Sequence, residues 1–296
     1  AQVLIPNDRE VLHILPQEFI VDDQDGVQNP LGMAAARLEV NVHIVTGSVT
    51  SAQNIIKCCN QSGLDVEDIV LEPLSSSQAV LSPDEQEVGV VLVDIGGGTT
   101  DVTIYSEGSI VHTAVLALGG NHLTHDIAIG LGAPLREAEE IKHKYGLAMA
   151  SMVEEGEMID VPSVGGRNNR TMQKKVLASI IEDRFREIFE LIAHEIEKTH
   201  FHNLMASGVV ITGGTCIMPG ADLLASQVLN LPVRVGYPEN ISGLREMIYS
   251  PKYATSVGLV RYGITSNQGK LNFVGDETNL FYKVSRRMKD WMQDFF

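Results

Sequence analysis

Apolar residues recur along this chain in two patterns, one typical of strands and one typical of helices. Residues 11–20 and 38–46 are expected to be strands, and the second alternates cleanly, with Leu38, Val40, Val42 and Ile44 on one face. Apolar positions three and four residues apart predict that 171–198 is the longest helix. Shorter helices are expected over 50–62, 75–81, 122–131, 134–145, a stretch ending near 230, and 253–262. Shorter strands are expected over 69–71, 88–93, 101–106, 109–116, 159–161, 208–212 and 232–235.

The last 32 residues differ from the rest. Residues 265–279 are polar, contain glycine and lack periodicity, which predicts a flexible linker. Residues 280–296 regain helical spacing, and their four basic and two acidic residues give a net charge of +2, which leaves −18 for the remainder of a chain with formal charge −16. A basic amphipathic helix of this kind suits binding in the plane of a membrane, and the alternative is a terminal helix packed on its own domain. The residues expected to contact lipid are Phe281, Val284, Arg286, Arg287, Met288, Lys289, Trp291, Met292 and Phe295.

Composition narrows the function classes. A hydrophobic content of 44% with only 5% aromatic residues suits an α/β protein rich in aliphatic side chains. The charge of −16 argues against broad nucleic-acid binding, which needs a basic face. Three cysteines are too few for a disulfide framework, and neither they nor the nine histidines show a zinc spacing, so a reduced cytosol is expected. The sequence contains no signal peptide and no apolar run of 18 residues, and its start at Ala1 suggests a fragment of a longer protein.

Residues 88–106, VGVVLVDIGGGTTDVTIYS, predict a buried strand, a tight glycine turn and a returning strand. Glycines at such a turn let main-chain N–H groups approach an anion closely. Carboxylates on both sides of the turn, at Asp94 and Asp101, would repel a phosphate unless a divalent cation intervened, so Mg²⁺ is implied. The alternative is an ordinary glycine-rich hairpin. The motif resembles the second phosphate loop of the actin, Hsp70 and sugar-kinase superfamily.

A second buried strand with a glycine turn follows at 207–215, SGVVITGGT. By itself it could be a strand-to-helix turn with glycine at its corner. Combined with the first turn, it resembles the adenosine motif of the same superfamily. The resemblance implies an actin-like (ribonuclease H-like) ATPase fold, in which two α/β halves surround a nucleotide cleft.

Longer segments favour one family. The residues VLHILPQEFIVDDQDGVQNPLG (11–32), HTAVLALGGNHLTHDIA (112–128), VPSVGGR (161–167) and NISGL (240–244) closely resemble the FtsA family of bacterial cell-division actins. The similarity runs from Val11 to Thr265. It implies part of subdomain 1C over 1–47, part of 1A over 48–87, 2A over 88–118 and 203–265, 2B over 119–202, a linker over 266–279 and a membrane-targeting helix over 280–296.

The resemblance also assigns residues to a nucleotide. The implied ATP contacts are Asp94, Gly96, Gly97, Gly98, Thr99, Thr100, Gly119, Gly120, Asn121, Arg184, Glu187, Gly213, Gly214 and Thr215. Asp94 would hold the hydrated Mg²⁺, whereas Arg184 and Glu187 could equally be solvated charges on a helix. The family's first phosphate loop, of the form D/E-I-G-T/S-x-K, has no counterpart in this sequence. The first α/β half is therefore expected to be incomplete, and half of the phosphate clamp is unassigned.

The implied function is nucleotide-controlled assembly. Family members bind ATP, form filaments on the cytoplasmic face of the inner membrane at the septum, and tether FtsZ to that membrane through 2B. Anionic lipids, other copies of the chain and other division proteins are the expected partners, with at most weak ATPase activity and no metabolic reaction. The alternatives are a sugar or small-molecule kinase of the same fold, which would need a substrate-activating acid, and an actin-like pilus-assembly protein.

Overall fold

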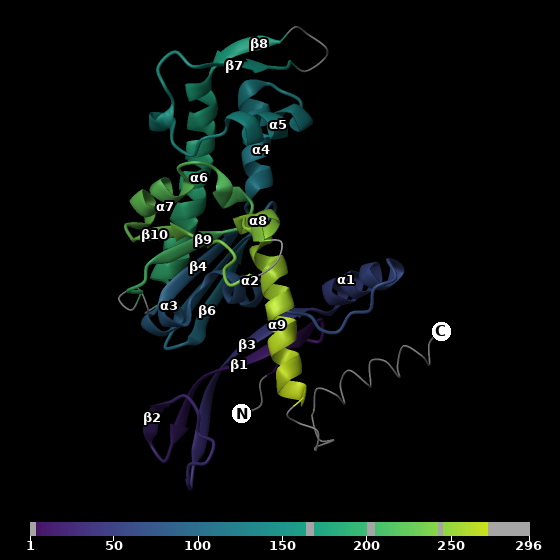
Figure 1. The fold of residues 1–296 in the computed structure, drawn as a ribbon, viewed down its shortest axis with the longest axis vertical. Helices are drawn as coiled ribbons and strands as arrows, with labels where there is room; N and C mark the ends of the chain where they lie inside the picture. Colours follow the sequence, from purple (N-terminus) through teal and green to yellow (C-terminus); the bar gives the residue numbers. More distant parts are fainter. Residues whose placement is uncertain (1–3, 164–168, 200–204, 242–244, 272–296) are drawn as a thin grey trace. The chain divides into compact units, whose positions relative to one another are not determined.

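The computed structural model describes residues 4–163, 169–199, 205–241 and 245–271, except the side chains of 266–271. The chain divides into two compact units, 1–259 and 260–296. The first unit contains three sheets and their covering helices, with the element order drawn in Figure 1. One mixed sheet and two antiparallel sheets, combined with helices, confirm the expected α/β class.

The central sheet has five strands in the order β10-β9-β4-β5-β6. Its members are β4 (Val90–Ile95), β5 (Thr100–Ser106), β6 (Ser109–Leu116), β9 (Val209–Thr212) and β10 (Val233–Val235). Strands β10, β9 and β4 run parallel, while β4, β5 and β6 form an antiparallel meander. Every residue of β4 is buried. The predicted glycine hairpin is therefore confirmed, at the centre of the sheet.

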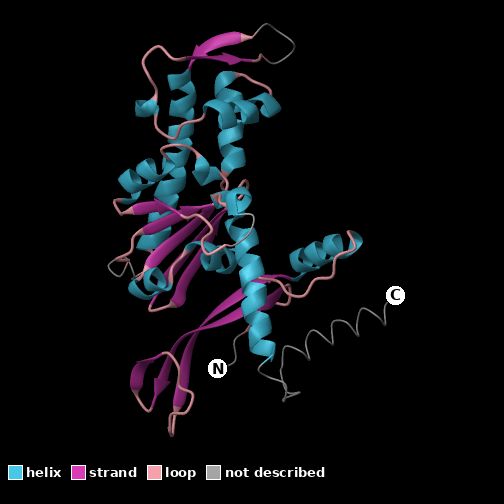
Figure 2. Cartoon of the chain, viewed as in Figure 1, coloured by secondary structure: helices cyan, strands magenta, loops and turns pink. Residues whose placement is uncertain are grey.

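Helices cover both faces of this sheet, because alternate residues of β4 point to opposite sides. Val91, Val93 and Ile95 share one core with α4 (Gly120–Leu131), α6 (Lys174–Glu197) and α7 (Ala221–Leu229). Val90 and Leu92 share the other core with α2 (Glu72–Val80) and with the start of α9 (Ala254–Leu271). The sheet thus forms the middle layer of a three-layer arrangement (Figure 2).

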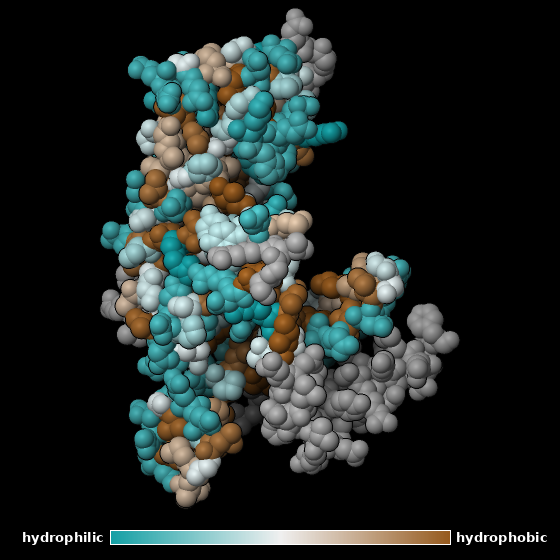
Figure 3. All heavy atoms as spheres, in the orientation of Figure 1, coloured by the Kyte–Doolittle hydropathy of each residue, from teal (hydrophilic) through white to brown (hydrophobic). Residues whose placement is uncertain are grey.

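A second sheet, in the order β2-β1-β3, is formed by β1 (Arg9–Val21), β2 (Gln24–Val27) and β3 (Leu38–Ser48). Its two long strands were predicted, whereas β2 was not. Leu38, Val40 and Val42 on β3 are exposed. On the face seen in Figure 3, hydrophobic residues are mixed with hydrophilic ones over the surface. Helix α1 (Val49–Gln61) follows β3 directly and begins at an Ser48 cap.

The third sheet pairs β7 (Met158–Val161) with β8 (Arg170–Gln173) beside α5 (Leu135–Tyr145) and α6, as Figure 1 shows. Helix α6 begins at Lys174 and not at Thr171, because residues 170–173 complete this hairpin. Its apolar stripe is fully buried at Phe185, Ile188, Phe189 and Ile192. The predicted longest helix is confirmed.

Several expected boundaries are wrong. The strand predicted over 69–71 has no partner strand among the described residues, and α2 starts at Glu72 in place of the expected residue 75. The apolar strand starts at Val90 because residues 83–88 form α3 (Pro83–Val88), where Ser82 and Glu85 make a capping box and Val88 is exposed.

Helix α9 also differs from expectation. It continues past residue 262 to Leu271 and includes 266–271, the first part of the expected linker. The rest of the linker and the helix predicted over 280–296 lie outside the described residues. Near its start α9 crosses α2 without a side chain between them, since a Cβ atom on Gly258 would lie 1.7 Å from the Ser75 carbonyl oxygen. The remaining short elements are α8 (Arg245–Ile248) and 3₁₀ turns at Ala150–Met152, Thr215–Ile217 and Pro251–Tyr253.

Candidate nucleotide-binding site

Three glycine turns meet at one end of the central sheet. The first follows β4, the second starts α4 and the third follows β9. The amide of Gly120 donates to the Gly96 carbonyl oxygen over 2.9 Å, and that of Asn121 donates to the Gly97 carbonyl oxygen over 2.7 Å. The hydroxyl of Thr215 donates to the same Gly96 oxygen over 2.9 Å. The structure therefore brings together residues that are more than a hundred positions apart in sequence.

The glycines of these turns serve different purposes. A Cβ atom on Gly119 would lie 2.6 Å from the Gly96 carbonyl oxygen, so only glycine lets the two turns touch. Gly213 has a φ of +93°, and a Cβ atom there would lie 2.4 Å from Oδ1 of Asp94. Gly98, by contrast, has nothing within 4 Å of its Cβ position and is exposed. Open space beside exposed backbone is what an incoming anion needs.

The two threonines of the first turn are placed differently. Thr99 is exposed, as a residue that contacts a ligand must be. Thr100 is fully buried, and its hydroxyl donates to the Leu118 carbonyl oxygen over 2.8 Å. Thr100 thereby joins the first turn to the segment that leads into the second.

Three carboxyl groups gather beneath the first turn. Asp94 and Asp101 face each other across the β4–β5 ladder, and both are buried. Burial, helped by the charges of Glu72 and Asp94, raises the pKa of Asp101 to about 7. Burial also raises the pKa values of Asp94 and of Glu72, and Asp94 adds to the shift of Glu72. Within the described ranges none of the three pairs with a basic side chain.

Such a cluster is suited to a nearby cation, which would relieve the mutual repulsion. No group of three or more His, Cys, Asp or Glu side chains in the described part of the chain is arranged to hold a metal ion. Asp94 and Asp101 supply carboxylate oxygens, which are the ligands that hard divalent cations prefer.

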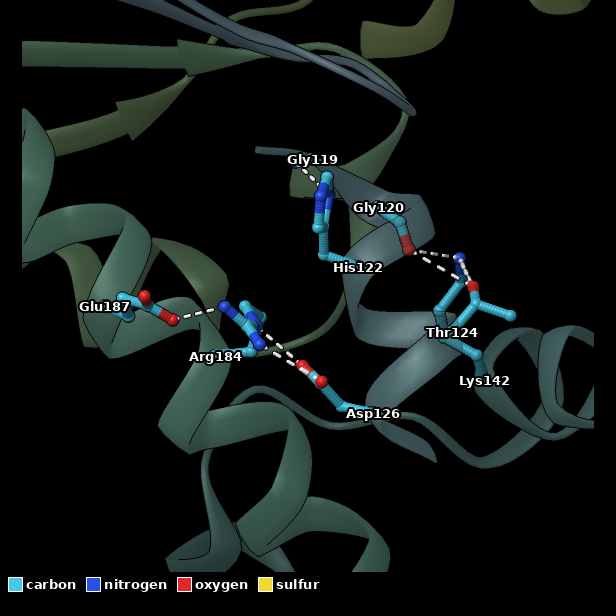
Figure 4. A network of polar contacts seen from close by, with 8 residues as sticks. All are labelled: Gly119, Gly120, His122, Thr124, Asp126, Lys142, Arg184 and Glu187. Carbon is cyan, nitrogen blue, oxygen red and sulfur yellow. Dashed lines mark hydrogen bonds and ion pairs between the residues drawn. The ribbon is translucent and has the colours of Figure 1, made fainter. Parts of the chain in front are cut away.

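Lys142 fastens the second turn to α5. Its ammonium, whose side chain is 10% exposed, donates to the Gly120 carbonyl oxygen over 3.1 Å and to the Thr124 hydroxyl over 2.8 Å. It also pairs with Glu139 over 2.7 Å. Figure 4 shows the lysine reaching the start of α4. A hollow of about 500 Å³ beside it is lined by Asn121, Thr124, Leu135, Arg136, Glu139 and Glu140.

Arg184 and Glu187 lie away from the turns, on α6. The Arg184 guanidinium binds both carboxylate oxygens of Asp126 on α4, over 2.5 and 3.0 Å, and it also binds Glu187 (Figure 4). Together they join α4 to α6 next to the site. Their contact with a nucleotide stays a prediction.

Sequence reasoning missed several residues of the site. Glu72 and Ser76 come from α2, and Lys142 comes from α5. Lys252 lies against the third turn, with its Cβ 3.7 Å from the Cβ position of Gly214. One signal was available: Ser75, Ser76 and Ser77 are three consecutive polar residues in one helical segment, and all three are buried.

The predicted lipid contacts, Phe281 to Phe295, lie outside the described residues. Among the residues that are described, no helix is both long and apolar enough to cross a membrane.

Comparison with known proteins identifies the family. The family model described as "Cell division protein FtsA" matches residues 91–258, and that described as "SHS2 domain inserted in FTSA" matches residues 1–46. Cell division protein FtsA of Pseudomonas aeruginosa is 44% identical over 99% of this chain and 72% of its own length. The Escherichia coli K12 protein of the same name is 38% identical over 98% of this chain and 70% of its own length.

Solved structures confirm the actin-like fold. MreB5 of Spiroplasma citri bound to ADP matches with a TM-score of 0.59 and 16% identity, over 88% of this chain and 90% of that one. A PilM–PilN type IV pilus biogenesis complex matches with a TM-score of 0.63 and 16% identity, over 88% of this chain and 68% of that one. At these identities the likeness concerns the fold alone. The family match covers more than half of the chain, and the chain therefore belongs to the FtsA family of cell-division proteins.

Proposed function

We propose that this cell-division protein binds ATP with Mg²⁺ at the three glycine turns and uses the bound nucleotide to control its assembly into filaments. The filaments attach to the cytoplasmic face of the inner membrane through residues 280–296 and tether FtsZ at the septum through 119–202. The single observation that carries this proposal is the direct contact of three glycine turns beside the buried carboxyl groups of Asp94 and Asp101.

Different groups of the chain would contact different parts of the bound nucleotide. Exposed backbone at Gly97, Gly98 and Thr99 offers N–H groups to phosphate oxygens, and the start of α4 adds a favourable helix dipole. The third turn, at Gly213 and Gly214, leaves room for the adenosine. Asp94 would hold Mg²⁺ through its water ligands, and the cation would supply positive charge that offsets the charges of the phosphates and of the carboxyl groups.

A solved structure of similar fold supports the proposal that this chain binds a nucleotide. The MreB5 structure contains ADP, and a second structure of the same protein contains AMPPNP. Membership of the cell-division family favours assembly over small-molecule phosphorylation, which would give the 280–296 segment no role. The charge of that segment, opposite in sign to the rest of the chain, supports attachment to anionic lipid.

Co-sedimentation with vesicles tests the proposal. The chain, FtsZ and Mg·ATP are mixed with vesicles of mixed anionic and neutral lipid, and pelleted FtsZ is measured. We expect FtsZ to pellet with the intact chain and to stay in solution when residues 280–296 are deleted. Neutral vesicles serve as the lipid control, and electron microscopy of the same samples reports filaments. Equal pelleting of FtsZ with both chains, or phosphoryl transfer to a small-molecule substrate without filaments, would contradict the proposal.

A further inference from the structure

The first turn of α9 is bonded to the carboxyl cluster through one hydroxyl group. Oγ1 of Thr255 lies 3.1 Å from Oγ of Ser76, 3.4 Å from Oδ2 of Asp94 and 3.5 Å from Oε1 of Glu72. Ser76 in turn donates to Oδ2 of Asp94 over a short 2.6 Å. Three elements, α2, β4 and α9, therefore meet around two hydroxyls and two carboxyl groups.

The number of protons available fixes which hydroxyl donates and which accepts in these hydrogen bonds. The Ser76 proton is used in the bond to Asp94, so the oxygen of Ser76 can only accept from Thr255. The chain of donors then runs from Thr255 through Ser76 to Asp94. Thr255 has a single proton, and its two longer contacts with Asp94 and Glu72 compete for it. Which acceptor it serves depends on which oxygen carries the most negative charge.

The main chain of Thr255 is also held. Oγ of Ser75 donates to the Thr255 carbonyl oxygen over 2.6 Å. Gly258, one turn further along α9, touches the backbone of Ser75. The main chain at Thr255 is thus fixed against α2, and its hydroxyl links this turn of α9 to Asp94.

We infer that Thr255 is a positioning residue for the phosphate and cation site: it acts through Ser76 to orient Asp94, and it couples occupancy of that site to the first turn of α9. The inference rests on the proposed function, since it assigns the regulation of the same site. The hydrogen bonds from Ser76 and Thr255 to Oδ2 of Asp94 hold this carboxylate in one orientation, which favours a cation held by it, and a bound cation would in turn fix Asp94 and its two donors. The first turn of α9 then has a different hydrogen-bond environment with and without Mg·ATP.

Three variants isolate the donor chain. Thr255→Val keeps the shape of the side chain and removes its hydroxyl, whereas Thr255→Ser keeps the hydroxyl. Ser76→Ala breaks the chain at its second member. Ser256→Val places the same valine on the exposed neighbouring position of α9 and serves as the matched control. Urea unfolding of each variant establishes that it is folded.

Two measurements test the inference: the affinity for a fluorescent ATP analogue in Mg²⁺ and in EDTA, and hydrogen exchange of amides 255–259 with and without Mg·ATP. We expect Thr255→Val and Ser76→Ala to weaken binding about tenfold in Mg²⁺ and not in EDTA, as for loss of one hydrogen bond to a charged group. The double variant should be no weaker than either single one, because both belong to one chain of donors. Thr255→Ser and Ser256→Val should behave as the unchanged protein, and only proteins with an intact donor chain should change exchange at 255–259.

The outcomes separate the two claims. If the unchanged protein binds the analogue in Mg²⁺ and Thr255→Val binds it equally well, the inference is overturned and the proposed function stands. Equal weakening in Mg²⁺ and in EDTA would reduce Thr255 to a packing role and also overturn it. If the unchanged protein binds the analogue in neither condition, both claims fail.

Discussion

Individual glycines in the candidate site are replaceable or irreplaceable according to what lies next to them. Gly119 has an extended φ of −172°, which any residue adopts, so its need for glycine comes only from the carbonyl oxygen of Gly96. Gly98 has neither a close neighbour nor a positive φ. The same motif therefore contains one position fixed by packing and one left open for a ligand.

Alanine substitutions should separate these positions. Gly119→Ala is expected to lower the free energy of unfolding by about 1–3 kcal/mol, because its Cβ would push the first two turns apart. Gly98→Ala, the matched control, should change it by less than about 0.5 kcal/mol. Urea unfolding in nucleotide-free buffer measures both. A similar loss in the two variants would contradict the role given to the Gly119–Gly96 contact.

Asp101 should make stability depend on pH. Its pKa is raised by burial from 3.8 to about 7, so between these values the folded chain keeps a proton that the unfolded chain has lost. The free energy of unfolding should then fall as the pH rises from about 4 to about 7, and the contribution of Asp101 should level off above that range. Asp101→Asn should flatten this slope and be more stable than the unchanged protein at pH 7.5. Unfolding curves in EDTA across this range provide the measurement, and parallel slopes would contradict the prediction.

Residues of the site could be predicted from the sequence only where neighbouring residues form a recognisable pattern. The glycine turns follow buried strands, and that combination is visible in a stretch of fewer than ten residues. Ser76 and Thr255 have no such pattern, because they meet Asp94 only through packing of α2 and α9 on one face of the sheet. Lys142 lies in a helical segment rich in charged residues, and only the fold shows that it contacts Gly120.

At the level of elements, length and burial decided which predictions were correct. The hairpin of β4 and β5 and the long helix α6 were expected because each carries a long apolar pattern. Strands β2 and β8 are four residues long and mostly exposed, and neither pattern can be detected over so few positions. Helix α3 was missed because its signal lies in the capping box and not in apolar spacing.

The packing of α6 on α4 can be tested through Arg184. Its bidentate, partly buried ion pair with Asp126 should contribute about 1–2 kcal/mol, more than an exposed pair. Arg184→Met is therefore expected to be destabilised by about that amount, and a double-mutant cycle with Asp126→Asn should recover the coupling. Arg186→Met is the matched control, since Arg186 pairs with Glu182 only within α6 and should lose about 0.3–0.5 kcal/mol.

Two results would contradict this assignment. One is a coupling free energy near zero between Arg184 and Asp126. The other is a loss in Arg186→Met as large as that in Arg184→Met. Either result would mean that Arg184 is a solvated charge on α6 that does not stabilise the packing of α6 on α4.

For the whole molecule, charge is distributed so that one short segment can bind an anionic surface. Residues 280–296 carry +2 while the remainder carries −18. Because anionic lipid repels the remainder, the proposed attachment must depend on the segment and must be sensitive to screening.

Vesicle binding should therefore fall as salt rises. Raising ionic strength from about 0.05 to 0.5 M shortens the Debye length several-fold and should release most of the bound chain from weakly anionic vesicles. Replacing Arg286, Arg287 and Lys289 by glutamine should lower binding at low salt and remove much of the salt dependence. Trp291→Ala tests the apolar contribution separately, and it should weaken binding at every salt concentration alike. Salt-independent binding of the unchanged chain would contradict the prediction.

The missing side chain at Gly258 has a mechanical consequence. Because the backbone of α9 rests directly on the Ser75 carbonyl, α9 cannot move closer to α2 at this point. This contact lies one turn from Thr255, so a larger residue at position 258 would push the first turn of α9 and the Thr255 hydroxyl away from Ser76 and Asp94. Such a substitution would disturb the carboxyl groups even in a chain whose glycine turns were intact.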